Sequence, residues 1–400
     1  MNTLIRRTIL SPLTTFFRTE QVTGYLLMIS VALAMLMVNT PLASVYHHFT
    51  HFNLGVTLAD KSFVRDVHWW VNDGLMALFF LLIGLEIKRE IVTGELSSFQ
   101  KSFLPIAAAL GGMMAPALIY YLVNAGLPTV SGWGIPIATD IAFALGILSL
   151  LGKKIPLSLK VFLAALAIVD DLGAILVIAV FYTDHILFHY VVYATTTFFI
   201  MLLMNRLKVL NFLFYFPFGI LLWYFTYKSG IHATIAGVLM AFTIPLIRDD
   251  KRSPLEKLEH ALHQPIGYIV MPLFAFVNTG IAFSAGMAGG IYSSAGLGII
   301  LGLLIGKPLG ILTFSWIAVR TGIASLPAKV SWRQVTGVGF LGGIGFTMSI
   351  FIALLSFSSL ENQEIAKISI LAASILSGLT GFFILKRQKA GEETGEETGS

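Results

Sequence analysis

Long apolar segments alternate with short polar ones along nearly the whole chain. A helix that crosses a bilayer needs about 20 mostly apolar residues, and a series of segments comes close to that length. They lie at 20–38, 67–88, 102–124, 128–150, 157–182, 189–206, 211–226, 230–247, 255–278, 296–319, 334–357 and 364–386. The pattern therefore predicts an all-α polytopic membrane protein with about 12 transmembrane helices.

The composition indicates that lipid, and not water, surrounds much of the chain. Of the 400 residues, 56% are hydrophobic and 12% are charged, whereas soluble proteins carry about 25% charged residues. The formal net charge of +5 does not indicate nucleic-acid binding, because the basic residues occupy short loops and form no long stripe. Cysteine is absent, which excludes disulfides and thiolate metal sites. We expect no bound cofactor.

The basic residues of the loops alternate between two sides of the membrane. One set of loops is rich in Lys and Arg, so the positive-inside rule places that set and both termini in the cytoplasm. The rich set holds Lys88, Arg89, Lys101, Lys153, Lys154, Lys160, Arg206, Lys208, Arg248, Lys251, Arg252, Lys257, Arg320, Lys329, Arg333, Lys386, Arg387 and Lys389. Both termini on one side require an even number of spans, which agrees with twelve.

Three parts follow from this topology. We expect a cytoplasmic segment at 1–19, a membrane domain at 20–388, and a disordered acidic tail at 389–400 that ends in the repeat GEETGEETGS. The first apolar run is expected to be retained, because the sequence Asn39-Thr40-Pro41 after it is a poor signal-peptide cleavage site.

The longest external loop, residues 40–66, is polar and is expected to be free of helix. In its segment NLGVTLAD, apolar and polar residues alternate as they do in a short β-hairpin. A loop of that length usually has a role, and a contact between two copies of the chain is our hypothesis. The alternative is a simple connector.

Ionisable residues inside membrane spans are costly and mark functional sites by default. The clearest case is AALAIVDDLGAILVIAV, in which Asp170 and Asp171 interrupt a long apolar run. Neighbouring helical residues point about 100° apart, so one carboxylate can face an ion path while the other faces a counter-charge. Lys307 is the obvious counter-charge, because it is the only basic residue deep in a span. The alternative, a purely structural ion pair, leaves the remaining acids unexplained.

Two spans carry motifs that break a helix. WGIPIATDIAFALG places Pro136, Thr139 and Asp140 mid-span, and GVGFLGGIGFTMSIF places several glycines and Thr347 there. Proline removes a helix hydrogen bond, and irregular backbone at membrane depth is tolerated where it lines a cavity. The breaks occupy corresponding positions in spans three to five and ten to twelve. We therefore expect two inverted three-helix repeats with crossing broken helices around a mid-membrane site. The alternative is a proline kink plus glycine packing.

These segments resemble the NhaA family of bacterial sodium/proton antiporters over roughly residues 20–388. The resemblance is carried by FFLLIGLEIKREIVTGEL, IPIATDIAFALG, LKVFLAALAIVDDLGAI, KSGIHATIAGV, LEHALHQP, LIGKPLGI and GGIGFTMSIFIA. It implies a secondary transporter, not an enzyme, in the bacterial inner membrane. It further implies electrogenic, pH-regulated exchange of cytoplasmic Na⁺ or Li⁺ for external protons. We expect a homodimer formed through the hairpin.

The resemblance also implies roles for individual residues. Asp171 matches the principal cation ligand, Asp170 its neighbour, and Lys307 the lysine that pairs with that neighbour. Asp140 and Thr139 match the assembly at the crossed broken helices and complete the expected Na⁺ site. A cytoplasmic cluster associated with pH activation is matched by Glu86, Arg89, Glu90, Glu259, His260 and His263. His232 matches a histidine that modulates the pH response.

The loop LIRDDKRSPLEKLEH departs from the family pattern. Arg248 and Glu256 stand where an acid and a lysine, respectively, are expected, which puts the pH threshold in doubt and leaves the transport site intact. The alternative interpretation is that the whole cluster is simply the solvent-exposed end of a helix.

The residues predict exchange by competition, in which Asp171 holds either a hard cation or a proton. Other functions fit the residues less well. An intramembrane aspartyl protease would need two carboxylates sharing a proton, which a buried lysine disturbs. An ion channel does not need a set of buried acids and a lysine that is coupled to protons. A transporter of another cation such as K⁺, or an ion-coupled symporter of the same fold, remains the alternative function.

Overall fold

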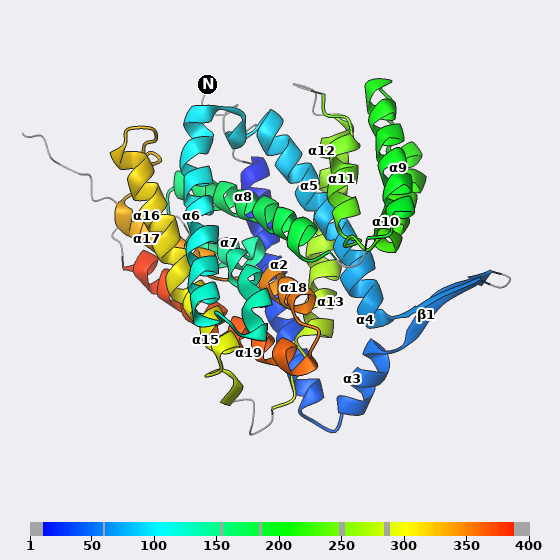
Figure 1. Cartoon of the computed structure of the whole chain (residues 1–400). Helices are drawn as coiled ribbons and strands as arrows, with labels where there is room; N and C mark the ends of the chain where they lie inside the picture. The colour runs from blue at the N-terminus through cyan, green and yellow to red at the C-terminus, as the bar shows by residue number, and fades with distance from the viewer. Residues whose placement is uncertain are drawn as a thin grey trace, which may run out of the picture.

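The described part of the chain is mostly helical and contains a two-stranded hairpin (Figure 1). The computed structural model describes residues 11–58, 61–152, 155–183, 186–247, 253–283 and 289–387. Six helical segments in those ranges are long and apolar enough to cross a membrane, or up to eight if each bent pair is one span. This confirms a helical membrane protein.

The unbroken candidate spans coincide with predicted apolar segments. They are α2 (Ser11–Val38), α6 (Phe99–Val123), α8 (Leu157–Phe181), α9 (Phe188–Arg206), α15 to α16 (Ser294–Arg320) and α19 (Leu360–Lys386). Helix α2 begins before the predicted start at residue 20, although its apolar part begins at Gln21. The expected acidic tail, 389–400, lies outside the described residues.

Two candidate spans are bent at a short break. The 3₁₀ helix η4 (Pro128–Ile137) meets α7 (Ile141–Leu150) at 43°, and α17 (Trp332–Gly342) meets α18 (Phe346–Ser356) at 44°. Both breaks fall on the motifs that predicted them. The first half-span is a 3₁₀ helix, in keeping with its two prolines and two glycines, which disfavour α-helix.

The other predicted segments are also helical. They contain α4 (Val67–Trp69), η2 (Trp70–Leu75), α5 (Met76–Val92), η6 (Phe212–Phe214), α10 (Tyr215–Ser229), α11 (Ile235–Thr243), α12 (Pro254–Pro265), η7 (Ile266–Val270) and α13 (Met271–Asn278). A short 3₁₀ turn, η3 (Glu95–Ser97), precedes α6. The π-helical turns η7 and η8 (Gly302–Gly306) each end two residues before a proline. A proline cannot donate to the preceding turn and clashes with it, so a wider turn accommodates Pro272 and Pro308.

The expectation that residues 40–66 lack helix is wrong, because Ala43–Thr50 form α3. An eight-residue helix is marginal by itself, and tertiary contacts stabilise this one. The Tyr46 hydroxyl donates to the carbonyl oxygens of Phe276 (2.9 Å) and Val277 (2.8 Å). The Tyr46 ring packs edge-on against Phe276.

The rest of the loop forms an antiparallel hairpin of β1 (Asn53–Leu58) and β2 (Lys61–Asp66). It projects away from the helices (Figure 1). In the middle of β2, Phe63 contacts Trp69, Trp70 and Trp223 edge-to-face. The Arg65 Nη2 donates to the Tyr227 hydroxyl at 2.6 Å, so α10 anchors the hairpin.

Helix α6 packs closely along α16, which carries Lys307 at its first residue. Gly111 of α6 and Gly310 of α16 face each other without side chains. A Cβ atom on either glycine would overlap the carbonyl oxygen of the other. Small residues of this kind allow helix backbones to approach closely in lipid, and here they fix the position of α16.

We predict that Gly310→Ala forces α6 and α16 apart. Overpacking of this kind costs about 1–3 kcal/mol, so the apparent Tm of the purified protein should fall by several degrees. The control is Gly289→Ala, because a Cβ atom there meets nothing within 4 Å. Equal Tm values for the two variants would contradict the close approach.

Candidate functional site

The two adjacent acids of α8 are buried and face different surroundings. Asp170 is 0% exposed and Asp171 is 1% exposed. Asp170 points to a lysine of α16, and Asp171 lines a pocket. Since adjacent residues of a helix diverge by about 100°, α8 alone accounts for this division.

Asp170 lies in a compact buried network with Lys307 and Thr139. Its Oδ2 accepts from the Lys307 Nζ at 2.6 Å and from the Thr139 hydroxyl at 2.7 Å. Lys307 is 0% exposed and also donates to the carbonyl oxygen of Ile137. The other oxygen of Asp170 has no hydrogen-bond partner among the described residues. The network holds Lys307 at the end of the half-helix η4.

Asp140 stabilises the start of both second half-helices. Its Oδ1 accepts from the Phe143 N–H (3.1 Å) at the start of α7. Its Oδ2 accepts from the Thr347 N–H (3.1 Å) and hydroxyl (2.5 Å) at the start of α18. The Asp140 N–H donates to the Ile344 carbonyl (2.7 Å) across the crossing. One carboxylate thus caps two helix N-termini, where partial positive charge gathers.

At the C-terminal ends of the first half-helices, side-chain donors bind the terminal carbonyl oxygens. Lys307 donates to Ile137 at the end of η4, and the Thr139 hydroxyl donates to the Gly342 carbonyl (2.9 Å) at the end of α17. Partial negative charge gathers at such ends. Three of the four half-helix ends therefore meet a charge that matches the helix dipole, and the fourth, at α17, meets a hydroxyl donor.

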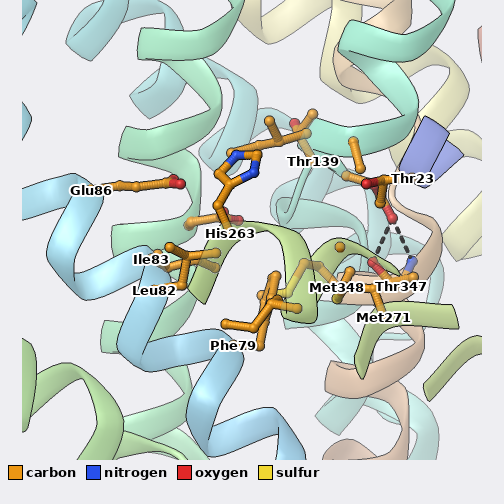
Figure 2. Close-up of a pocket in the computed structure, with 16 residues that line it drawn as sticks. Thr23, Phe79, Leu82, Ile83, Glu86, Thr139, His263, Met271, Thr347 and Met348 are labelled. Carbon is orange, nitrogen blue, oxygen red and sulfur yellow. Dashed lines mark hydrogen bonds between the residues drawn. The ribbon is translucent and has the colours of Figure 1, made fainter. Parts of the chain in front are cut away.

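A pocket of about 70 Å³ opens beside the crossing, with room for a few water molecules. Its polar lining consists of Thr23, Glu86, Thr139, Asp140, Asp171, His263 and Thr347. Figure 2 shows Glu86 and Thr23 on opposite sides of the pocket, with His263 between them. Phe79, Leu82 and Ile83 of α5 form an apolar wall.

Buried acids outnumber buried bases at the site. Three carboxylates, those of Asp140, Asp170 and Asp171, are buried with one ammonium group, that of Lys307. The helix N-termini compensate Asp140 and the lysine compensates Asp170, whereas no ion pair to Asp171 is formed by the described residues. Within the described ranges, no three His, Cys, Asp or Glu side chains converge as a metal site. Carboxylate and hydroxyl oxygens suit a hard cation as cargo.

Sequence comparisons agree with this geometry. Residues 14–385 match the model of the family described as Na+/H+ antiporter 1. An Na(+)/H(+) antiporter NhaA 2 of Flavobacterium johnsoniae is 55% identical over 93% of this chain and 91% of its own length. Relatives named NhaA from Flavobacterium psychrophilum and Bordetella parapertussis are each 48% identical, over 93% and 94% of this chain and 94% and 96% of their own lengths.

The chain belongs to the Na+/H+ antiporter 1 family. The predicted membership is confirmed.

In this antiporter-family chain the structure divides the cluster expected to sense pH into two groups. Arg89 forms ion pairs with Glu90 (3.1 Å) and Glu259 (3.0 Å). Glu86 and His263 instead line the pocket of Asp171. The last member of the cluster, His260, is exposed, and Glu256 is half-buried on the first turn of α12. Arg248, the other departure from the family pattern, lies outside the described residues.

His232 lies apart from that cluster and faces an acid. Its Nε2 is 4.0 Å from Asp73 Oδ1, its Nδ1 is 2.9 Å from the Thr234 hydroxyl, and its ring packs edge-on against Phe351 of α18. Asp73 is not among the site residues predicted from the sequence. The cost of burying an acid in a membrane span is the sequence signal that could have identified Asp73 as a partner of His232.

Two threonines of the pocket were not assigned to the site from sequence. Thr347 stood in a motif already noticed, and its hydrogen bonds to Asp140 give it a positioning role. Thr23 lies on α2, near the start of the first span, in an ordinary apolar context. A single threonine there gives no sequence signal, because its contact with the pocket depends on how α2 packs.

We predict that Asp140→Asn is more stable than Asp140→Ala. The amide oxygen can still accept from a helix N-terminus, whereas alanine removes both caps at about 1 kcal/mol each. Thermal unfolding of the purified variants measures the difference. If the two variants unfold at the same temperature, Asp140 does not cap the two half-helices.

Proposed function

We propose that the chain exchanges cytoplasmic Na⁺ or Li⁺ for external protons by competition at Asp171. The observation that carries the proposal is the unequal setting of the two adjacent acids. Asp170 is engaged by Lys307 and Thr139. Asp171 Oδ1 has no hydrogen-bond partner among the described residues and lies beside a pocket lined by further oxygens.

The exchange follows from the cost of moving uncompensated charge. A deprotonated, empty Asp171 carries a negative charge that is expensive at membrane depth, so the empty site does not reorient. Binding of either a cation or a proton removes that charge and allows movement between the two sides. The Asp170–Lys307 pair opens as Na⁺ displaces protons, and the carboxylates and the lysine titrate as one coupled set. More than one proton per cation makes the exchange electrogenic.

Thr139 and Asp140 contribute the remaining parts of the proposed Na⁺ site. Thr139 has a hydroxyl oxygen that faces both Asp170 and the pocket. Asp140 holds the two half-helices in place and lines the same pocket. Half-helix ends at a mid-membrane site are the arrangement that alternating access uses in related folds.

We further propose twelve spans in the bacterial inner membrane, with both termini in the cytoplasm and two inverted three-helix repeats. The support is that each predicted apolar segment contains helix in the described ranges, and that the middle member of each proposed repeat is bent. The projecting hairpin supports a homodimer through β1 and β2, since a free strand edge can pair with another chain.

The cluster around Arg89 is proposed to regulate the exchange with pH. Glu86 is three residues from Arg89 and four from Glu90, so one face of α5 joins the ion-pair group to the pocket. Protonation of Glu259 would release Arg89 and change the charge beside Glu86. His232, between Asp73 and α18, is proposed as a second pH-dependent contact.

Asp171→Asn tests the transport site. An amide cannot exchange a proton for a cation, so Na⁺-driven pH change in everted vesicles should fall to the level of vesicles without the protein. Glu361→Gln, which changes an exposed acid on α19, should retain wild-type exchange. Wild-type exchange by Asp171→Asn would falsify the assignment, and exchange driven by K⁺ would redirect the choice of cation.

Arg89→Gln tests the regulatory cluster. Without its guanidinium partner, Glu259 should keep its proton to higher pH, and the activation profile should move to higher pH by about 0.5–1 unit. The maximal rate should change little. The control is Lys257→Gln, an exposed basic residue of α12. A lower rate at every pH with an unmoved midpoint would contradict a regulatory role.

A further inference from the structure

A second cavity, apart from the ion pocket, lies between α2, α7 and α19 and has a volume of about 600 Å³. This is within the usual range of about 300–1,000 Å³ for small-molecule sites. Gly24, Gly146 and Gly378, one from each helix, line it. We call this cavity the lipid groove.

The walls of the lipid groove are apolar. Of its lining residues, Gln21, Tyr25 and Ser374 carry a polar group. The Ser374 Oγ is already used, since it accepts from the Phe346 N–H at 3.2 Å. Met28 and Ile375 are 47% and 61% exposed. Because α2 and α19 are candidate spans, this opening faces hydrocarbon.

The inner wall of the lipid groove is the outer surface of the helix crossing. The rings of Phe143 and Phe346 meet there edge-on, with centroids 4.8 Å apart. Phe143 donates its N–H to Asp140, and Phe346 directly precedes Thr347. A molecule in the lipid groove therefore contacts one residue in the first turn of each half-helix that Asp140 caps.

One end of the lipid groove is basic. Phe382 lines that end, and the Lys386 Nζ lies 5.6 Å from the centre of its ring. Arg387 follows, and both basic side chains are exposed. From Gln21 to Met35 the lining of α2 extends about 21 Å at 1.5 Å per residue. One leaflet of hydrocarbon is about 15 Å thick, so a lipid chain fits with its headgroup near Lys386.

We propose that the lipid groove binds one anionic phospholipid. Its acyl chain lies along α19 against Phe143 and Phe346, and its phosphate contacts Lys386 and Arg387. This site is separate from the proposed ion exchange, and neither depends on the other.

Ile375→Trp tests the chain-binding part. The indole should fill the lipid groove, because Ile375 is an exposed member of its lining. Leu376→Trp is the matched control, since Leu376 is 46% exposed on the same helix but does not line the lipid groove. The proteins are extracted from vesicles of equal parts phosphatidylglycerol and phosphatidylethanolamine, and bound lipid is counted by native mass spectrometry.

We expect one retained phosphatidylglycerol in the wild type and in Leu376→Trp, and its loss in Ile375→Trp. Equal retention by the two tryptophan variants would overturn the site. A change of oligomer mass in Ile375→Trp without loss of lipid would also overturn it, because the occupant would then be a second copy of the chain.

Lys386→Gln tests the headgroup part. A basic residue at the membrane surface attracts anionic lipid by an amount equivalent to about fivefold in binding. The preference for phosphatidylglycerol over phosphatidylethanolamine should therefore fall about fivefold. Arg320→Gln, at the exposed end of α16, should keep the wild-type preference. An unchanged preference in Lys386→Gln would overturn phosphate recognition there.

Discussion

The cost of burying charge away from water is the constraint on which the rest of this structure depends. Three carboxylates and one ammonium group lie within the fold at or below 2% exposure, and an isolated charge there would be prohibitive. Breaking two helices supplies the compensation. N–H groups at the starts of α7 and α18, which have no partner within their own helix, donate to Asp140. The carbonyl at the end of η4 accepts from Lys307, which also pairs with Asp170.

The buried side chains and the half-helix ends compensate each other's charge, so the site and the fold depend on the same contacts. Removing one partner of a buried ion pair commonly costs about 3–5 kcal/mol, and Lys307 also completes the end of a half-helix. Its position depends in turn on the glycine contact between α6 and α16. Mutations at these positions are therefore expected to affect stability together with the proposed exchange.

The pocket gives a physical route between the proposed regulatory cluster and the acid pair. Glu86 and His263 line it together with Asp171, while Arg89 and Glu259 form an ion pair just beyond. One turn of α5 separates Glu86 from Arg89, so the ion pair and the pocket are close neighbours along that helix. The lipid groove meets the same crossing from its other side, through Phe143 and Phe346.

The sequence by itself determined the apolar segments, the buried Asp170, Asp171 and Lys307, and the motifs at which two spans break. These features are local, because hydropathy, glycine and proline act on the neighbouring backbone. Only the tertiary structure decided that α3 forms, that Thr23 reaches the pocket, and that Glu86 and His263 join Asp171 there. Each of those outcomes depends on segments far apart in the chain packing together, and the energy of such packing is not encoded in any one segment.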